Sequence, residues 1–97
     1  MYKPGKDVTA PKLVHEVKPR YTEEAKQARI QGMVTMDVVV LENGTAGDVS
    51  VTKSLDTEYG LDNEAVKAAK QWLFEPGRKD GKAVAVVVTV EMSFALK

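Results

Sequence analysis

Alternation between apolar and polar residues near the C-terminus constrains this chain most strongly. Between residues 84 and 94 every second side chain is apolar, and the intervening positions include Thr89, Glu91 and Ser93. Residues 33–41 alternate in the same way, with valines or methionine at the even positions from 34 to 40. A period of two places successive side chains on opposite faces of a strand. The sequence therefore predicts two long strands that each bury one face.

A tight turn follows the first of these strands. Asn43-Gly44 supplies the two residue types that adopt positive φ angles most readily, which is typical of a hairpin turn. Val49 and Val51 then alternate with polar residues in a further strand. Because a short connection cannot join parallel neighbours, the two strands must run antiparallel.

Capping residues indicate two helices. Thr22 precedes two glutamates and is typical of a helix start, and Gly32 is expected to end that helix, with Ala28 on its inward face. Asp62 is expected to cap a second helix, which residues 74–77 end with a proline and a glycine. Asp80-Gly81 predicts a turn before the last strand.

The order helix, strand, strand, helix, strand predicts an α+β two-layer sandwich. A right-handed crossover through the second helix returns the last strand parallel to the second one, with the first strand between them. The sheet is then three-stranded and mainly antiparallel, and both helices cover one face of it. A chain of 97 residues has room for one such core. We expect residues 1–12, which mix prolines, a glycine and charges, to be a linker or basic arm, and residues 13–97 to form the domain.

The charge balance argues against nucleic acid as a partner. Fourteen basic and fourteen acidic residues cancel, although residues 1–20 hold five lysines or arginines against two acids. The longest apolar run, residues 83–88, is much shorter than the roughly 20 residues that span a bilayer. We therefore expect any membrane anchor of the natural protein to lie outside this chain.

No set of residues predicts catalysis, a cofactor or a metal. The chain has no cysteine, and its one histidine, His15, has no triad partner beside it. Glu23-Glu24 and Glu64 stand where helix starts favour negative charge, so they are interpreted as structural. Trp72, beside Phe74 and Pro76, is interpreted as a core residue. We expect a protein that is not an enzyme.

Several short motifs in order resemble one known family. They are Pro19-Arg20-Tyr21 followed by Glu24-Ala25 and Gly32, the Asn43-Gly44 hairpin, Leu61-Asp62 with Ala65, and Trp72-Leu73-Phe74-Glu75-Pro76 followed by Asp80-Gly81-Lys82 and a valine-rich strand. With this order and spacing, the chain from about residue 11 to residue 94 resembles the TonB C-terminal domain of bacterial energy transducers. It departs at Thr22, where the family commonly has proline, and at Lys18 and Arg20, where some members have glutamine.

The resemblance implies a periplasmic domain of a protein anchored in the inner membrane. Such a domain binds the docking peptide of an outer-membrane TonB-dependent transporter by strand addition, and an inner-membrane motor complex acts on it through the N-terminal region that this chain lacks. The implied partner-binding residues lie before the first helix and in the last strand: Lys18, Pro19, Arg20, Tyr21, Val86, Val87, Val88, Thr89, Val90 and Glu91. A strand-exchanged homodimer of the truncated domain is a further expectation.

Two alternatives stay open at this point. From the residues alone, the last strand is either a free edge or a central, covered strand, and the resemblance favours the edge. The domain is either part of an energy transducer or a similar interaction or sensor domain attached to another cell-envelope protein.

Overall fold

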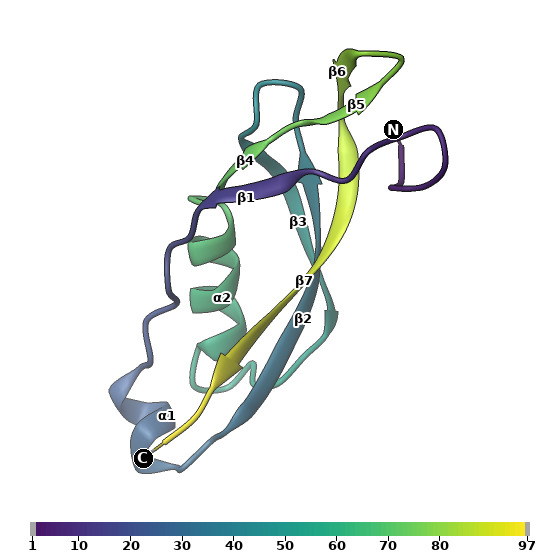
Figure 1. Cartoon of the computed structure of the whole chain (residues 1–97). Helices are drawn as coiled ribbons and strands as arrows, with labels where there is room; N and C mark the ends of the chain where they lie inside the picture. The colour runs from purple at the N-terminus through teal and green to yellow at the C-terminus, as the bar shows by residue number, and fades with distance from the viewer. Residues whose placement is uncertain (1, 97) are drawn as a thin grey trace.

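The computed structural model describes residues 2–96. Across that range the chain forms two helices and seven strands (Figure 1). In order they are β1 (Lys12–His15), α1 (Glu23–Gln27), β2 (Gly32–Val40), β3 (Ala46–Lys53), α2 (Leu61–Ala69), β4 (Leu73–Glu75), β5 (Gly77–Lys79), β6 (Lys82–Val84) and β7 (Val86–Phe94). The molecule is elongated, with extents of 50 × 21 × 21 Å. Within residues 2–96 no helix has the length and apolar character needed to cross a bilayer.

The main sheet has the strand order β3-β2-β7, with both neighbours antiparallel to β2. This confirms the predicted α+β fold and the place of the first long strand between the other two. The β2–β7 pairing runs without a shift from Gly32 opposite Phe94 to Val40 opposite Val86. Because β7 has β2 on one side only, it is an edge strand of this sheet.

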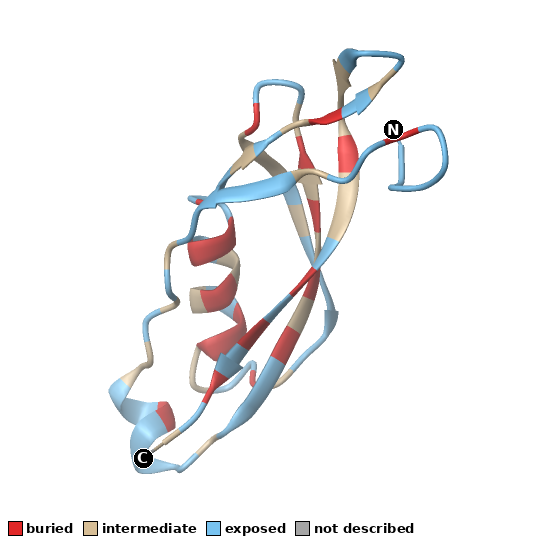
Figure 2. Ribbon diagram, in the orientation of Figure 1, coloured by how far each residue is buried: buried red, intermediate tan, exposed pale blue. Residues whose placement is uncertain are grey.

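The core lies between this sheet and α2. Every even residue of β2 from Val34 to Val40 is fully buried, and α2 buries Leu61, Ala65 and two further alanines opposite them. Figure 2 shows the buried positions of α2 and of the sheet facing one another. Burial of each valine or methionine side chain contributes about 1.5–3 kcal/mol. The alternation in the sequence therefore sets which face of the sheet the helix covers.

Helix α1 begins as predicted and ends differently. The Thr22 hydroxyl accepts a hydrogen bond from the Ala25 amide at 3.2 Å, which caps the first turn. Gly32 does not end the helix. Arg29 takes the left-handed position at φ +56°, and the amide of Ile30 bonds back to the Ala25 carbonyl at 3.0 Å. Ala28, expected to face inward, is exposed at the end of this short helix.

The start of α2 also differs from the prediction. Gly60, at φ +90°, is the capping residue, and Asp62 lies inside the first turn. The Asp62 carboxylate instead accepts hydrogen bonds from the amides of Leu55 and Asp56, both at 3.0 Å, and from the Ser54 hydroxyl. Burial acts to raise the pKa of Asp62, but these three hydrogen bonds outweigh it and lower that pKa below its ordinary value. Asp62 therefore fixes the preceding loop and does not cap the helix.

The sequence analysis did not predict the short strands that follow α2. Residues 74–77, read as a simple helix break, include most of β4, which pairs with β1. The Asp80-Gly81 turn is confirmed, with φ angles of +51° and +80°, and it joins β5 to β6. The final strand is interrupted at Ala85, between β6 and β7.

Gly44 packs against β4 and provides a test of this arrangement. Its φ is +85°, and a Cβ there would lie 2.1 Å from the Phe74 carbonyl oxygen. Gly81 has a similar φ of +80° but open space around it. We expect Gly44→Ala to lower the free energy of unfolding by more than about 2 kcal/mol and Gly81→Ala by about 1 kcal/mol, because only the first adds a collision to the backbone strain. Urea denaturation of both variants measures the difference, and equal losses would contradict the packing of Gly44 on β4.

Candidate functional site

The outer edge of β7 carries backbone groups that point away from β2. The Val87 amide donates to the Tyr2 carbonyl at 2.8 Å, and the Tyr2 amide donates to the Ala85 carbonyl at 3.1 Å. Both Ala85 and Val87 therefore direct their backbone polar groups outward. In an antiparallel ladder, hydrogen-bonded and non-hydrogen-bonded positions alternate. The amides and carbonyls of Thr89, Glu91 and Ser93 must then also face outward, because the β2–β7 register has no shift.

These three residues form the free part of the edge. Their backbone groups make no backbone hydrogen bond on the outer side to any residue between 2 and 96. All three residues are exposed, whereas Val90, Met92 and Phe94 between and beyond them are buried. The structure thus decides the alternative that the residues alone left open, in favour of an edge strand. We call residues 89–93 the free edge.

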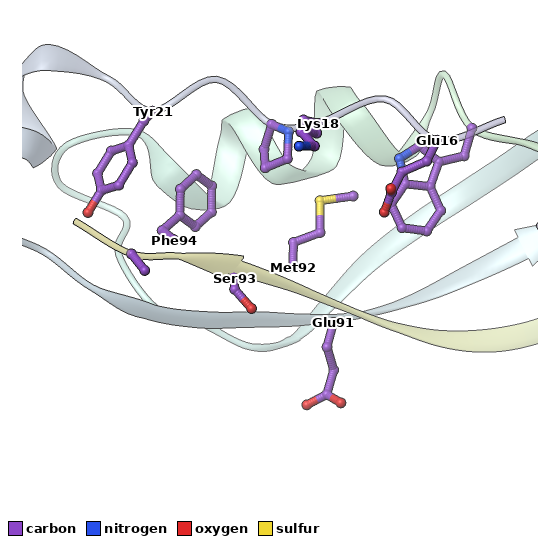
Figure 3. A pocket seen from close by; sticks show the side chains of 10 residues that line it. Glu16, Lys18, Tyr21, Glu91, Met92, Ser93 and Phe94 are labelled. Atoms are coloured by element: carbon purple, nitrogen blue, oxygen red, sulfur yellow. The ribbon is translucent and has the colours of Figure 1, made fainter. Parts of the chain in front are cut away.

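A groove of about 400 Å³ lies beside the free edge. It is lined by residues of three segments: Glu16, Lys18, Pro19, Tyr21, Trp72, Glu91, Met92, Ser93, Phe94 and Ala95. Figure 3 shows Met92 and Phe94 pointing toward the segment that carries Lys18 and Tyr21, while Glu91 points away from it. The groove therefore has β7 as one wall and residues 16–21 as the other.

Side chains of the core fix the second wall. The indole Nε1 of Trp72 donates to the Val17 carbonyl at 2.8 Å. The Tyr21 hydroxyl donates to the Ile30 carbonyl, and the Tyr21 ring meets the Phe94 ring edge-on with centroids 5.4 Å apart. A segment without regular secondary structure is thereby held at both ends against the sheet. The groove is consequently built into the fold before any partner arrives.

The predicted site residues fall into three groups. Lys18, Pro19 and Tyr21 line the groove together with Glu91, whereas Arg20 is exposed and is not among the lining residues. Val87, Thr89 and Glu91 direct their backbone outward, and the outward amide of Val87 is already paired with the Tyr2 carbonyl. Val86, Val88 and Val90 pair with β2. The backbone groups of these three valines therefore face β2 and not the outer edge. The binding role of all the predicted site residues stays a prediction.

Sequence reasoning missed part of the groove. Glu16, Met92, Ser93, Phe94 and Ala95 also line it. The period-two pattern extended to residue 94, so it contained the signal that Ser93 continues the series of Thr89 and Glu91. Glu16 carried no such signal, because its position depends on how residues 16–21 cross the core.

The groove combines charges of both signs with an apolar floor. Lys18 and Glu16 bring opposite charges to it, whereas the Glu91 side chain points away from residues 16–21 (Figure 3), and Met92 and Phe94 supply apolar surface. No group of three or more His, Cys, Asp or Glu residues in the part of the chain that the structure describes could hold a metal ion. The arrangement offers backbone pairing, apolar contact and one cation, which suits recognition of an extended peptide.

Comparison with known families places these features in context. The family described as "Gram-negative bacterial TonB protein C-terminal" matches residues 17–96. A solved structure of similar fold is the solution NMR structure of the Pseudomonas aeruginosa TonB C-terminal domain. That chain is 30% identical, the match covers 96% of this chain and 90% of that one, and the TM-score is 0.70.

Curated proteins give the same result. The chain is 36% identical over 83 residues to the protein tonB2 of Pseudomonas aeruginosa. The matched residues make up 86% of this chain and 30% of that protein. It is 38% identical over 78 residues to a TonB protein of Xanthomonas campestris pv. campestris, covering 80% of this chain and 34% of that protein. A Vibrio cholerae TonB protein is 34% identical over 91 residues, and the match covers 93% of this chain and 37% of that protein. The chain thus spans about a third of the length of these relatives.

Proposed function

Because the chain belongs to the family of Gram-negative bacterial TonB protein C-terminal domains, we propose that it is a non-enzymatic, energy-transducing adaptor. It binds the docking peptide of outer-membrane TonB-dependent transporters by strand addition. It transmits force to them from a proton-motive motor in the inner membrane. In this proposal the domain is periplasmic, and the motor complex acts through an N-terminal region with its membrane anchor.

The free edge is the observation that carries this proposal. Thr89, Glu91 and Ser93 offer three amides and three carbonyls along one side of β7. An extended peptide that pairs with them fills the groove between β7 and residues 16–21. Backbone pairing accepts many sequences, and the side chains of the walls add selectivity. At about 1 kcal/mol net for each hydrogen bond, such a peptide is held reversibly.

Force transmission follows from the direction of loading. Tension along the strand axis loads the hydrogen bonds of an added strand together, so none of them has to carry the load alone. The second wall supports the peptide from the other side, because Trp72 and Tyr21 tie it to the core. A peptide that is bound with moderate affinity can then carry a mechanical load and still dissociate afterwards.

A titration of the isotope-labelled domain with candidate docking peptides tests the proposal. We expect the largest backbone amide shifts at Thr89, Glu91 and Ser93, and smaller ones across residues 16–21. The amides of residues that are exposed on α2, such as Asn63 and Lys67, serve as the internal control. Shifts confined to the helices, with none in β7, would overturn strand addition as the mode of binding.

Lys18 is expected to select acidic residues flanking the docking peptide. Lys18 lines the groove and Arg20 does not, although both are exposed. Exposed charges are screened over about 8–10 Å near physiological ionic strength, so the attraction weakens with salt. We expect Lys18→Gln to weaken docking by about threefold at low salt and to flatten the salt dependence, with a smaller effect for the matched control Arg20→Gln. Calorimetric titration at several salt concentrations measures both slopes, and an unchanged slope for Lys18→Gln would remove this residue from the site.

A further inference from the structure

The N-terminal arm, residues 2–9, occupies part of the same strand edge. Tyr2 forms a parallel bridge with Val86. The Tyr2 amide donates to the Ala85 carbonyl at 3.1 Å, and the Tyr2 carbonyl accepts from the Val87 amide at 2.8 Å. The Nζ atom of Lys79 lies 4.8 Å from the centre of the Tyr2 ring. Tyr2 thus acts as a short added strand, supplied by the chain itself, at the end of β7 that precedes the free edge.

The rest of the arm is tied to the β5–β6 hairpin. Val8 is only 7% exposed and forms a bridge with Lys79. The Thr9 amide donates to the Arg78 carbonyl at 2.9 Å, and the Arg78 amide donates to the Thr9 hydroxyl at 3.0 Å. Between these contacts and Tyr2 the chain reverses direction, and the Gly5 amide donates a hydrogen bond to the Val8 carbonyl at 3.0 Å. Val8 and Thr9 therefore hold the base of the arm, while Tyr2 depends on two backbone bonds and one exposed ring contact.

A second hollow marks the point where the arm ends and the free edge begins. It measures about 460 Å³ and is lined by Lys3, Pro4, Asp37, Val87, Val88 and Thr89. Lys3 and Pro4 follow Tyr2 directly, and Thr89 is the first residue of the free edge. A peptide that pairs along residues 89–93 and continues toward Ala85 must therefore meet the arm here.

We propose that the arm is an intramolecular competitor for the Ala85 and Val87 positions of the docking edge. While Tyr2 is in place, a docking peptide is limited to the free edge, and a longer peptide gains the remaining positions only by displacing Tyr2. This inference rests on the proposed function, since it concerns how much of that docking edge a partner reaches. Two hydrogen bonds at about 1 kcal/mol net each correspond to roughly a thirtyfold change in affinity, which is the scale of the competition.

Amide exchange tests whether the arm occupies the edge in solution, and it needs no partner. Tyr2→Pro removes the donor to Ala85 and the ring on Lys79, whereas Tyr2→Phe keeps a backbone amide and a ring and serves as the control. Fluorescence or circular dichroism confirms that both variants are folded. We expect the Val87 amide to exchange at least about fivefold faster in Tyr2→Pro than in Tyr2→Phe. Equal exchange rates would overturn the proposal.

Peptides of two lengths then test competition. A short peptide pairs with residues 89–93 alone, and a long one continues to Ala85. We expect Tyr2→Pro to bind the long peptide up to about thirtyfold more tightly than Tyr2→Phe does, and the affinity for the short peptide to be the same in both variants. If the short peptide binds and the long one shows no difference between variants, the competition is overturned alone. If neither peptide binds either variant, the proposed function fails, and the competition fails with it.

Discussion

Replacement of Thr89 by proline is expected to leave the domain folded and to reduce docking-peptide affinity by more than about tenfold. The Thr89 amide faces away from β2 and has no backbone partner between residues 2 and 96, so its loss removes no bond of the sheet. The proline removes a donor from the free edge and places its ring where an added strand would lie. Peptide titration measures the affinity, and far-UV circular dichroism checks the fold.

Val90→Pro is the matched control at the neighbouring position. Val90 is buried, pairs with Met36 of β2, and directs its amide into the ladder. The same substitution there removes a sheet hydrogen bond and a core side chain together, and we expect it to unfold the domain or to lower its stability by more than about 3 kcal/mol. A Thr89→Pro variant that unfolds as Val90→Pro does would contradict the outward direction of the Thr89 amide. A folded Thr89→Pro variant with full affinity would contradict docking on this edge.

The same variant bears on self-association. A strand with free amides and carbonyls is a template for pairing with a second copy of the chain. If the isolated domain dimerises at high concentration through this edge, the Thr89→Pro variant is expected to sediment as a monomer under the same conditions. Unchanged dimerisation would place the contact between copies elsewhere on the molecule.

The sheet could be predicted from the sequence because its determinants are local and periodic. Four buried positions at even spacing in β2, and the same alternation in β7, set the faces of two strands. The Asn43-Gly44 turn and the crossover through α2 then set the order β3-β2-β7. Each of these signals lies within a few residues of the structure that it predicts.

The errors arose where distant backbone segments decide the structure. Strand β4 is three residues long and depends on its pairing with β1, about 60 positions earlier in the chain. Asp62 had the sequence context of a helix cap, but its carboxylate accepts hydrogen bonds from the amides of Leu55 and Asp56 in the preceding loop, and Gly60 takes the capping position. Tyr2 pairs with β7 through backbone atoms alone, so the identity of its side chain could not predict the pairing.

The candidate site was predicted in part for the same reason. The alternation groups Thr89, Glu91 and Ser93 as one set, and Lys18, Pro19 and Tyr21 came from the resemblance to a family. What no pattern could supply is that residues 16–21 lie across from the free edge. That placement depends on Trp72, whose indole bonds to Val17 from 55 positions away.

Trp72 therefore combines a structural role with a place beside the groove, and its substitution separates the two. Trp72 is only 7% exposed, belongs to the core cluster, and lies 6.2 Å from the Phe74 ring centre. We expect Trp72→Ala to lower the free energy of unfolding by about 3–5 kcal/mol, through lost burial and a residual cavity. For a domain of this size that is a large part of the total, and it corresponds to a fall in Tm of roughly 12–40 °C.

Trp72→Phe is the variant that distinguishes packing from binding. It keeps an aromatic ring in the core and loses the hydrogen bond to the Val17 carbonyl, which is worth about 1–2 kcal/mol of stability. We expect its Tm to fall by roughly 4–16 °C. The docking affinity of the folded protein is expected to change by less than about threefold, because the Tyr21 contacts still hold the wall and Trp72 does not pair with the peptide. Calorimetric melting and peptide titration below the transition measure the two effects separately. A variant with the wild-type Tm and a strongly weakened affinity would show instead that Trp72 contacts the partner directly.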